Sequence, residues 1–362
     1  MKHKFLFALS CLCSIVCYGQ SPLDSLLRDQ LKPEAEQPVH SISVYFENAG
    51  KVTQAAVGVD PHSGPVQNDY AFRIASATKP FVATIIMQLQ EEGKLKLNDW
   101  LQTHLTFDSL QLWQGKDHTS QLRLIQLLQH RSGLADVLGD QREAFTQQLF
   151  ADPQRQYDPQ SILETFYALD LPQKAHFAPG EGWFYSDMNY VLLGMLIEKL
   201  EGVPLAASIR KRILDPLGMQ HTYFEFYETP ANPKPMVTPF VGPYDFSQIN
   251  TSFDWAGGGL VSTHQDLALF IKGLFQGRLI SEKSLGQMCD TQATGNTESP
   301  YGLGLYKVSY HGQEYFGHYG FYGTFIGYSP ANQGLISYNV AQSGPHFNTY
   351  NLINQLLEHL ND

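Results

Sequence analysis

Cysteine is almost absent from this sequence outside its first twenty residues. The chain of 362 residues has four cysteines, and three of them, Cys11, Cys13 and Cys17, stand near the N-terminus. Only Cys289 remains for the rest of the chain, which excludes a disulfide framework and a cysteine-ligated metal site. The fold must therefore be stabilised by its hydrophobic core.

Positive charge is also scarce. Lys and Arg number 24 against 35 Asp and Glu, which gives a formal net charge of −11. A chain this acidic is a poor binder of phosphate backbones, so no nucleic-acid partner is expected. Hydrophobic residues make up 43% of the chain and charged residues only 16%, which argues against disorder and coiled coil. The length suits one compact unit with a helical insertion.

The first nineteen residues have the composition of a signal peptide. Lys2 and Lys4 precede an apolar run over 5–18, and the small residue Gly19 stands where cleavage would fall. The run is shorter than the roughly twenty apolar residues of a membrane span. We therefore expect a periplasmic or secreted protein of residues 20–362 with no stable membrane span after leader removal. A lipid-modified cysteine and a permanent anchor are the alternatives left open.

The order of the expected elements indicates an α+β fold. Alternating apolar residues predict a hairpin over 39–57, and four strands over 301–310, 313–318, 323–328 and 335–340. Helical periodicity appears over 76–93, 122–129, 160–215 and 348–360. Strands at both ends imply one antiparallel sheet flanked by helices, made of residues 39–90 and 256–362, with a mainly helical insertion over 91–255. The proline- and aromatic-rich stretch 226–255 predicts a long ordered loop with a functional role.

Several common catalytic motifs are missing. The sequence has no glycine-rich phosphate loop ending in Lys-Ser/Thr, no HExxH and no complete GxSxG. Nucleotide-binding, zinc-protease and α/β-hydrolase interpretations are therefore disfavoured, and no metal or organic cofactor is expected.

A serine and a lysine three residues apart stand at the start of the expected helix at 76. The spacing of Ser76 and Lys79 places the amine and the hydroxyl on one helix face, where the amine can take the serine proton. Ser208 and Lys211 repeat the pattern beside Arg210 and Arg212, which predicts an exposed, unreactive helix. Since serine is also a common N-cap residue, the residues alone leave a structural role for Ser76 equally open.

Five ordered sequence blocks decide between these interpretations. With them the sequence resembles the serine β-lactamase-like and penicillin-binding-protein-like hydrolases, on the side of class C β-lactamases, D-Ala-D-Ala carboxypeptidases, D-aminopeptidases and esterases. The blocks are Ile74–Pro80, Leu127–Leu134, Pro179–Asp187, Ala256–Thr263 and Gly317–Gly320.

The resemblance implies a role for each motif residue. Ser76 matches the acylated nucleophile and Lys79 its activating partner, while Tyr185 matches the tyrosine that relays a proton. The neighbouring Lys79 is expected to lower the pKa of Tyr185. His318 to Gly320 match the third motif, with His318 catalytic, while Asp187, Tyr319 and Gly320 are expected to bind substrate. The backbone N–H groups of Ser76 and Phe321 would then form an oxyanion hole.

Three residues depart from the family pattern. Asp187 replaces the usual Asn, so it would pair with Lys79, move base duty to Tyr185 and repel anionic substrates. Tyr319 replaces a Thr that holds a substrate carboxylate, and His318 replaces a Lys, as in carboxypeptidase and esterase members. The resemblance thus implies a hydrolase whose substrate is a small molecule or peptide, an ester or amide of the D-amino-acid type. A catalytically impaired scaffold for binding or sensing and a weak β-lactamase are the alternatives.

Overall fold

The computed structural model describes residues 22–343 and 348–361. The signal peptide predicted for residues 1–19 lies outside these described residues and remains a prediction. In the described ranges, no helix combines the length and the apolar character that crossing a membrane requires.

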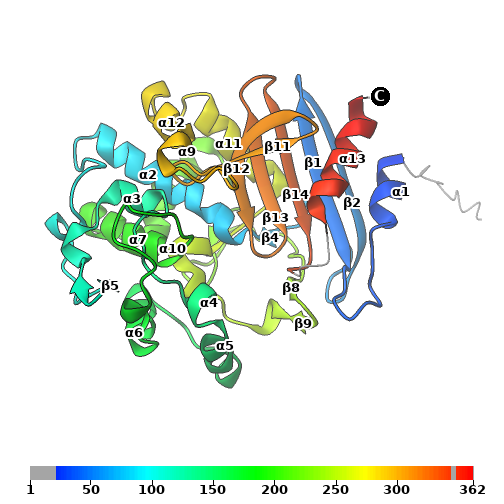
Figure 1. The fold of residues 1–362 in the computed structure, drawn as a ribbon. Coiled ribbons are helices and arrows are strands. Elements are labelled where there is room, and N and C mark those ends of the chain that lie inside the picture. The colour runs from blue at the N-terminus through cyan, green and yellow to red at the C-terminus, as the bar shows by residue number, and fades with distance from the viewer. Residues whose placement is uncertain (1–21, 344–347, 362) are drawn as a thin grey trace, which may run out of the picture.

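A seven-stranded antiparallel sheet, in the order β11-β12-β13-β14-β1-β2-β3, forms the centre of the molecule (Figure 1). The N-terminal and C-terminal strands meet where β1 pairs with β14, with Ile42 opposite Val340. The predicted α+β class, with one sheet built from both ends of the chain, is confirmed. The strands are β1 (Ser41–Asn48), β2 (Lys51–Asp60), β3 (Gly64–Pro65), β11 (Tyr306–Tyr310), β12 (Gln313–Gly320), β13 (Thr324–Ser329) and β14 (Gly334–Val340).

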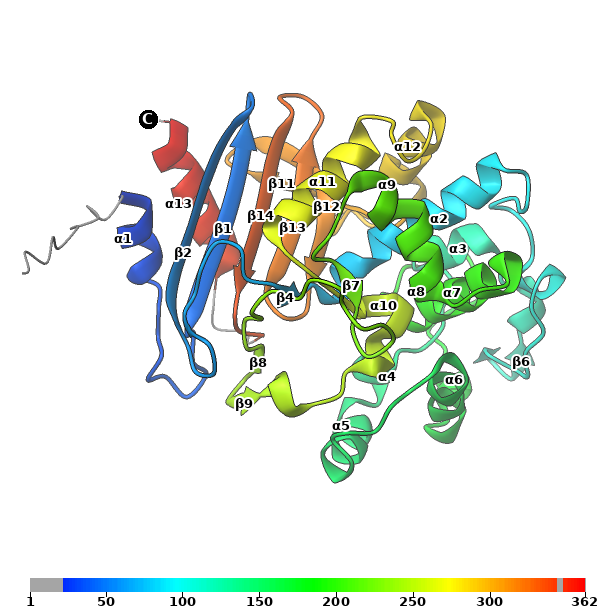
Figure 2. The ribbon, with the colours of Figure 1, turned by 180° about the vertical axis from the view of Figure 1, so that it is seen from behind.

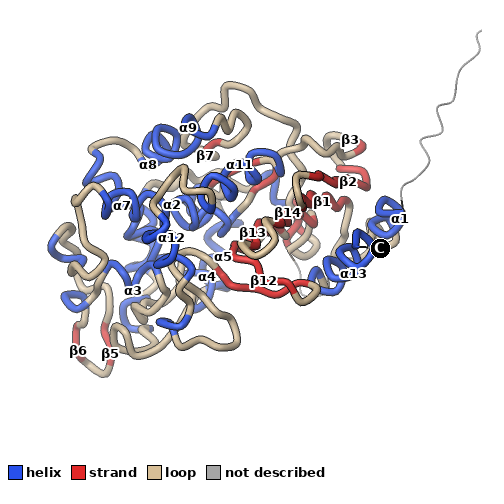
Figure 3. The backbone as a smooth tube through the Cα atoms, turned by 90° about the horizontal axis from the view of Figure 1, so that it is seen from above, coloured by secondary structure: helices blue, strands red, loops and turns tan. Residues whose placement is uncertain are grey.

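Both faces of the sheet are buried. Helices α1 (Pro22–Arg28) and α13 (Thr349–Asn361) cover one face (Figure 3). On that face alternate residues of β1 such as Val44 pack in one cluster with Phe325 and Leu352. On the other face Tyr45 and Ile326 join the main core with the helices of the middle region. Two-sided burial explains why β13 and β14 are buried along their whole length.

The middle region is mainly helical, with α2 and α7 at its centre. Ten of the thirteen residues of α2 are buried, so this helix serves as the core on which the neighbouring elements pack. The helices are α2 (Lys79–Glu91), α3 (Leu124–Leu128), α4 (Val137–Asp140), α5 (Arg142–Ala151), α6 (Pro159–Ala168), α7 (Met188–Glu201), α8 (Leu205–Ile209), α9 (Asp215–Leu217), α10 (Trp255–Gly258), α11 (His264–Phe275) and α12 (Glu282–Cys289).

Short strands complete the connections between these helices. The strands β4 (Phe72–Arg73), β10 (Leu260–Ser262) and β7 (Tyr223–Phe224) form a small sheet in the order β4-β10-β7, which lies next to the end of the large sheet. Two further pairs are β5 (Leu112–Trp113) with β6 (Lys116–Asp117), and β8 (Phe240–Val241) with β9 (Tyr244–Asp245). The stretch 226–255 is thus an ordered loop that contains the β8-β9 hairpin.

The sequence predictions need three corrections. The helix expected from Ser76 begins as the short 3-10 turn η1 (Ala75–Thr78) and becomes α-helical only at Lys79. The strand expected over 301–310 starts at Tyr306, because Gly304 has a φ of +76° and its Cα approaches α2 too closely for a side chain. Ser208 is fully buried in α8, whereas an exposed helix was expected there.

Candidate active site

Ser76 lies on a strained turn between β4 and α2. The preceding residue, Ala75, has a φ of +44°, in the left-handed region that a non-glycine residue rarely adopts. The turn is fixed from both sides, because the Ile74 N–H donates to the Leu260 carbonyl and the Thr78 hydroxyl accepts from the Leu260 N–H. The caps of η1 and α2 are Ile74 and Thr78, so the N-cap interpretation of Ser76 is wrong.

Lys79 is fully buried and directs its amine at Ser76. Its Nζ lies 3.0 Å from Ser76 Oγ, 2.5 Å from Asp187 Oδ1 and 2.7 Å from the Gly257 carbonyl oxygen. An ammonium group has three protons to donate, and these three acceptors take all of them. The expected pairs of Lys79 with Ser76 and with Asp187 are therefore both present.

Tyr185 lies over the same amine, with its ring centroid 4.8 Å from Lys79 Nζ. Its hydroxyl is buried. Burial and the charge of Asp187 raise the pKa of Tyr185 well above 10, and the nearby Ser76 hydroxyl only partly opposes this rise. The expectation that Lys79 lowers this pKa is wrong, and the phenol is protonated at neutral pH.

Two further carboxyl groups surround the Lys79–Asp187 pair. Asp136 accepts 2.7 Å hydrogen bonds from the backbone N–H groups of Asp187 and Gly139, and Asp254 accepts one of 3.3 Å from Tyr322. Burial, followed by the charge of Asp187, raises the pKa of Asp136 to about 7 and that of Asp254 to about 8. We call Asp136, Asp187 and Asp254 the carboxyl cluster.

The third motif adopts a different arrangement from the one expected. His318 is buried, and its Nδ1 donates to the Tyr319 carbonyl while Nε2 accepts from the Tyr301 hydroxyl. Burial lowers the pKa of His318 to about 3, so the ring is neutral. It lies behind Tyr185, at 6.2 Å between ring centroids, and it does not line the cleft. His318 therefore packs next to Tyr185 in this structure, and its catalytic role stays a prediction.

Tyr319 and Gly320 also differ from the expectation of substrate contact. Successive strand residues face opposite sides, and Tyr319 points away from His318 to hydrogen bond with Tyr310 and pack on Phe325. Gly320 brings β12 against the turn before Ser76, because a Cβ atom there would lie 2.1 Å from the Ile74 carbonyl oxygen. Its function in this arrangement is close backbone approach.

His130, which the sequence analysis did not select, is part of the site. It is completely buried, has a φ of +56° and stacks on Tyr185 at 4.2 Å between ring centroids. Its Nδ1 accepts hydrogen bonds from the Ser186 N–H and the Asn189 side chain. Burial keeps the pKa of His130 well below 6.5, so the ring is neutral. Its hydrogen bonds and its stacking on Tyr185 fix the segment that carries Tyr185 and Asp187, and we call this role the clamp.

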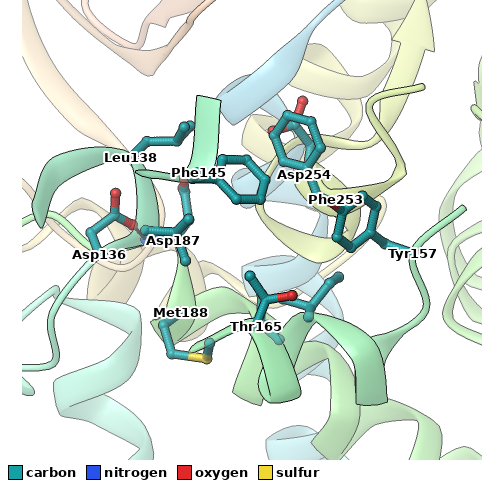
Figure 4. A pocket seen from close by; sticks show the side chains of 12 residues that line it. Asp136, Leu138, Phe145, Tyr157, Thr165, Asp187, Met188, Phe253 and Asp254 are labelled. Atoms are coloured by element: carbon teal, nitrogen blue, oxygen red, sulfur yellow. Dashed lines mark hydrogen bonds between the residues drawn. The ribbon is translucent and has the colours of Figure 1, made fainter. Parts of the chain in front are cut away.

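These residues surround one cleft of about 550 Å³. Its lining includes Ser76, Tyr185, Phe321 and all three members of the carboxyl cluster. A smaller pocket continues beneath it, and Figure 4 shows Asp136 and Asp187 next to each other on its wall together with Asp254. Four of the predicted residues, Ser76, Tyr185, Asp187 and Phe321, line the cleft, with Lys79 directly beneath. His318, Tyr319 and Gly320 are not among the lining residues.

Within 22–343 and 348–361, no three His, Cys, Asp or Glu side chains are arranged as metal ligands. Asp136, Asp254 and His130 were missed because each reaches the site only through tertiary contacts. A signal was nevertheless present for His130, since it precedes Arg131-Ser132-Gly133 within one of the five blocks.

Comparisons with known proteins agree with this geometry. The model of the Beta-lactamase family matches residues 23–359. PbpX of Bacillus subtilis (strain 168), which is named as a penicillin-binding protein, is 27% identical over 276 residues, covering 73% of this chain and 61% of PbpX. Esterase EstB of Burkholderia gladioli is 30% identical over 179 residues, covering 49% of this chain and 43% of EstB.

A solved structure extends the likeness over almost the whole fold. The D-amino acid amidase from Ochrobactrum anthropi SV3 superposes with a TM-score of 0.73 and 25% identity, covering 93% of this chain and 99% of the amidase. The chain spans less than two thirds of the length of the curated relatives named above. Since the family model matches nearly all the residues that build the sheet, the helical region and the cleft, this chain belongs to the Beta-lactamase family.

Proposed function

We propose that this chain is a serine hydrolase that cleaves a small ester or amide, of the D-amino-acid peptide or ester type, through an acyl-enzyme at Ser76. The carrying observation is the 3.0 Å contact between Ser76 Oγ and the buried Lys79 Nζ. The names of EstB and of the D-amino acid amidase support an ester or amide substrate. The composition of residues 1–19 supports action in the periplasm or outside the cell.

Acylation begins when Ser76 Oγ attacks the substrate carbonyl carbon and its proton passes to Lys79 as the neutral amine. The backbone N–H groups of Ser76 and Phe321 stabilise the oxyanion. Tyr185, which is protonated because its pKa is raised, gives its proton to the leaving group and regains one from Lys79. The bond to the leaving group breaks, an ester remains on Ser76 and Lys79 is again neutral.

Deacylation uses the same groups in reverse. A water molecule attacks the ester carbonyl, Lys79 accepts the water proton and returns a proton to Ser76 Oγ as the ester bond breaks. Both steps need the neutral amine, whereas the ion pair with Asp187 at 2.5 Å holds Lys79 as an ammonium.

The carboxyl cluster bears on the charge of the substrate. At pH values above the pKa of Asp136 (about 7) and of Asp254 (about 8), the cleft carries three carboxylates around one buried amine. Such a cleft disfavours anionic substrates and favours neutral or amine-bearing ones. A D-amino acid amide or ester with a free amino group fits this charge. A penicillin carries a carboxylate, so we propose β-lactam hydrolysis as a weak side activity at most.

A second candidate function is a scaffold retained for binding or sensing. The observation that favours it is the same Asp187–Lys79 pair, because a carboxylate that holds Lys79 as an ammonium withholds the base that Ser76 needs. The two candidates differ in whether Ser76 reacts with electrophiles.

Mass spectrometry after exposure to a fluorophosphonate tests the proposal. We expect one adduct per chain at Ser76 and none in Ser76→Ala or Lys79→Ala. Ser208→Ala, which removes the serine of the second Ser-x-x-Lys pattern, is the matched control and should be labelled like the natural protein. Absence of any adduct would support the binding scaffold. Hydrolysis of p-nitrophenyl esters, D-Ala-D-Ala peptides and a chromogenic cephalosporin then separates esterase, peptidase and β-lactamase activity.

A further inference from the structure

The cleft that contains Ser76 is also lined by apolar and aromatic side chains. They are Leu149 and Phe150 of α5, Val241, Tyr244 and Phe246 of the long loop, and Tyr322. We call these six residues the apolar arm. The whole cleft, at about 550 Å³, lies within the range of roughly 300–1,000 Å³ that is usual for small-molecule sites.

Ring contacts connect the arm from the rim of the cleft to the nucleophile. Phe150 lies 5.3 Å from Tyr244 and 6.4 Å from Phe246, and Phe246 lies 6.4 Å from Tyr322. Phe246 and Tyr322 belong to one buried cluster with Ala75, the residue before Ser76. An apolar group attached to Ser76 through an ester therefore has a continuous apolar path to the rim.

Two exposed rings, Phe150 and Tyr244, lie at the outer end of the arm, and we call them the roof rings. Phe150 is 43% exposed and Tyr244 is 56% exposed, and they come from α5 and from the β8-β9 hairpin. Figures 1 and 2 show this hairpin and α5 at the same end of the molecule. Because large apolar groups at a cleft rim lose water contact when a ligand covers them, a roof of this kind suits an apolar ligand.

The proposed reaction places the leaving group beside Tyr185, which donates a proton to it. Tyr185 packs on His130 and Tyr301 and not on the rings of the arm within the described residues. Tyr322 and Phe246 instead pack with Ala75, next to the Ser76 that would bear the acyl group. These contacts favour the acyl group, rather than the leaving group, as the occupant of the arm.

We propose that the apolar arm binds the acyl part of the substrate, that this acyl part carries a large aliphatic or aromatic group, and that Phe150 and Tyr244 limit its length. This inference rests on the proposed acyl-enzyme at Ser76. The substrate class becomes an ester or amide of an acid with a bulky apolar group, which places the apolar group in the arm and the reacting carbonyl beside the carboxyl cluster.

The test varies the acyl chain while the leaving group stays the same. We would measure kcat/KM for p-nitrophenyl acetate, butyrate and octanoate with the natural protein and with Phe150→Ala and Tyr244→Ala. Each methylene group that binding removes from water contributes about 0.8 kcal/mol, which corresponds to a factor of about four in kcat/KM. We therefore expect the natural protein to favour butyrate over acetate. The octanoate-to-acetate ratio should rise at least about tenfold when either roof ring is removed. Tyr350→Ala, an exposed aromatic on α13 outside the cleft, is the matched control and should leave the ratio unchanged.

A second series keeps the acetyl group and lengthens the alcohol. If the roof variants change preference in this series rather than in the acyl series, the arm binds the leaving group and the inference is wrong. An unchanged octanoate-to-acetate ratio in both roof variants also overturns it. Fluorophosphonate labelling of the same preparations distinguishes failure of the acyl-site inference from failure of the proposed function. Ser76 that is labelled without any shift in preference refutes the acyl site alone, whereas unlabelled Ser76 with no hydrolysis refutes the proposed function and the acyl site with it.

Discussion

Replacing Asp187 by Asn tests the assignment of Lys79 as the base. The substitution keeps an oxygen that can accept the hydrogen bond from Lys79 Nζ, now 2.5 Å from Asp187 Oδ1, and removes the negative charge. It also restores the residue that the resemblance leads one to expect at this position. Without that charge the ion pair that holds Lys79 as an ammonium is lost, so we expect kcat/KM at a fixed neutral pH to rise.

The magnitude follows from the exposure of the pair. A hydrogen bond to a charged acceptor contributes about 1.5–3 kcal/mol and one to a neutral acceptor about 0.5–1.5 kcal/mol. The Asp187 side chain is 34% exposed, so solvent screens the pair and the low end of this difference applies. A difference of about 1 kcal/mol corresponds to roughly fivefold higher kcat/KM.

The assay is kcat/KM for p-nitrophenyl acetate at one neutral pH, with Ser76→Ala as the blank for spontaneous hydrolysis. The second-order rate of fluorophosphonate labelling at the same pH reports acylation alone. Asp69→Asn is the matched control, since it removes an aspartate paired at 2.8 Å with Lys234, away from the cleft. Unchanged or lower kcat/KM and labelling rate in Asp187→Asn refute the assignment of Lys79 as the base that Asp187 restrains.

Three other substitutions test the parts of the site that sequence analysis did not assign correctly. Asp136 has a pKa of about 7 in the folded protein against an ordinary value of 3.8, so the folded state binds more protons between these values and the free energy of unfolding falls as pH rises from about 4 to 7. Asp136→Asn should remove up to about 4 kcal/mol of this decline, measured by urea unfolding at both ends of the range; an unchanged slope contradicts the raised pKa. His130→Ala should lower the free energy of unfolding by roughly 2–4 kcal/mol and reduce kcat, because two hydrogen bonds and the ring stacked on Tyr185 are lost. His130→Asn, which tolerates the positive φ and supplies an acceptor, should recover part of the stability but not kcat; equal kcat in the two variants would count against the clamp. Gly320→Ala should slow Ser76 labelling at least about tenfold, since its Cβ would displace β12 from Ile74, whereas Gly286→Ala, which meets open space, should not; normal labelling in Gly320→Ala would refute the close-approach argument.

Local patterns were sufficient for much of the fold. The hairpin and the C-terminal strands follow from alternation, since residues such as Val44 and Ile336 face one side of a buried sheet. The terminal helix follows from Leu352, Ile353 and Leu356 at helical spacing. The strand expected from Tyr301 was wrong because the close approach of Gly304 to α2 is a tertiary contact, which a local pattern does not contain.

The site was predicted as far as its chemistry depends on spacing. Ser76 and Lys79 meet because one helical turn separates them, and the contact between Lys79 and Asp187 was expected from the family motif. The pKa of Tyr185 could not be predicted, because it depends on burial and on the Asp187 charge. The placement of Tyr319 was predictable, because adjacent strand residues face opposite sides and only one of His318 and Tyr319 can face Lys79.

The pairing of β1 with β14 determines how late during synthesis the central sheet can be completed. Ile42 and Val340 are neighbours in space and about 300 positions apart in the chain, so the β14 side of β1 has no partner until about 300 further residues have been made. The strand that carries Gly320 also reaches Ile74 late. A nascent chain therefore displays an open strand edge and an incomplete candidate site, and both its protection from aggregation and the completion of that site depend on the arrival of β12 to β14.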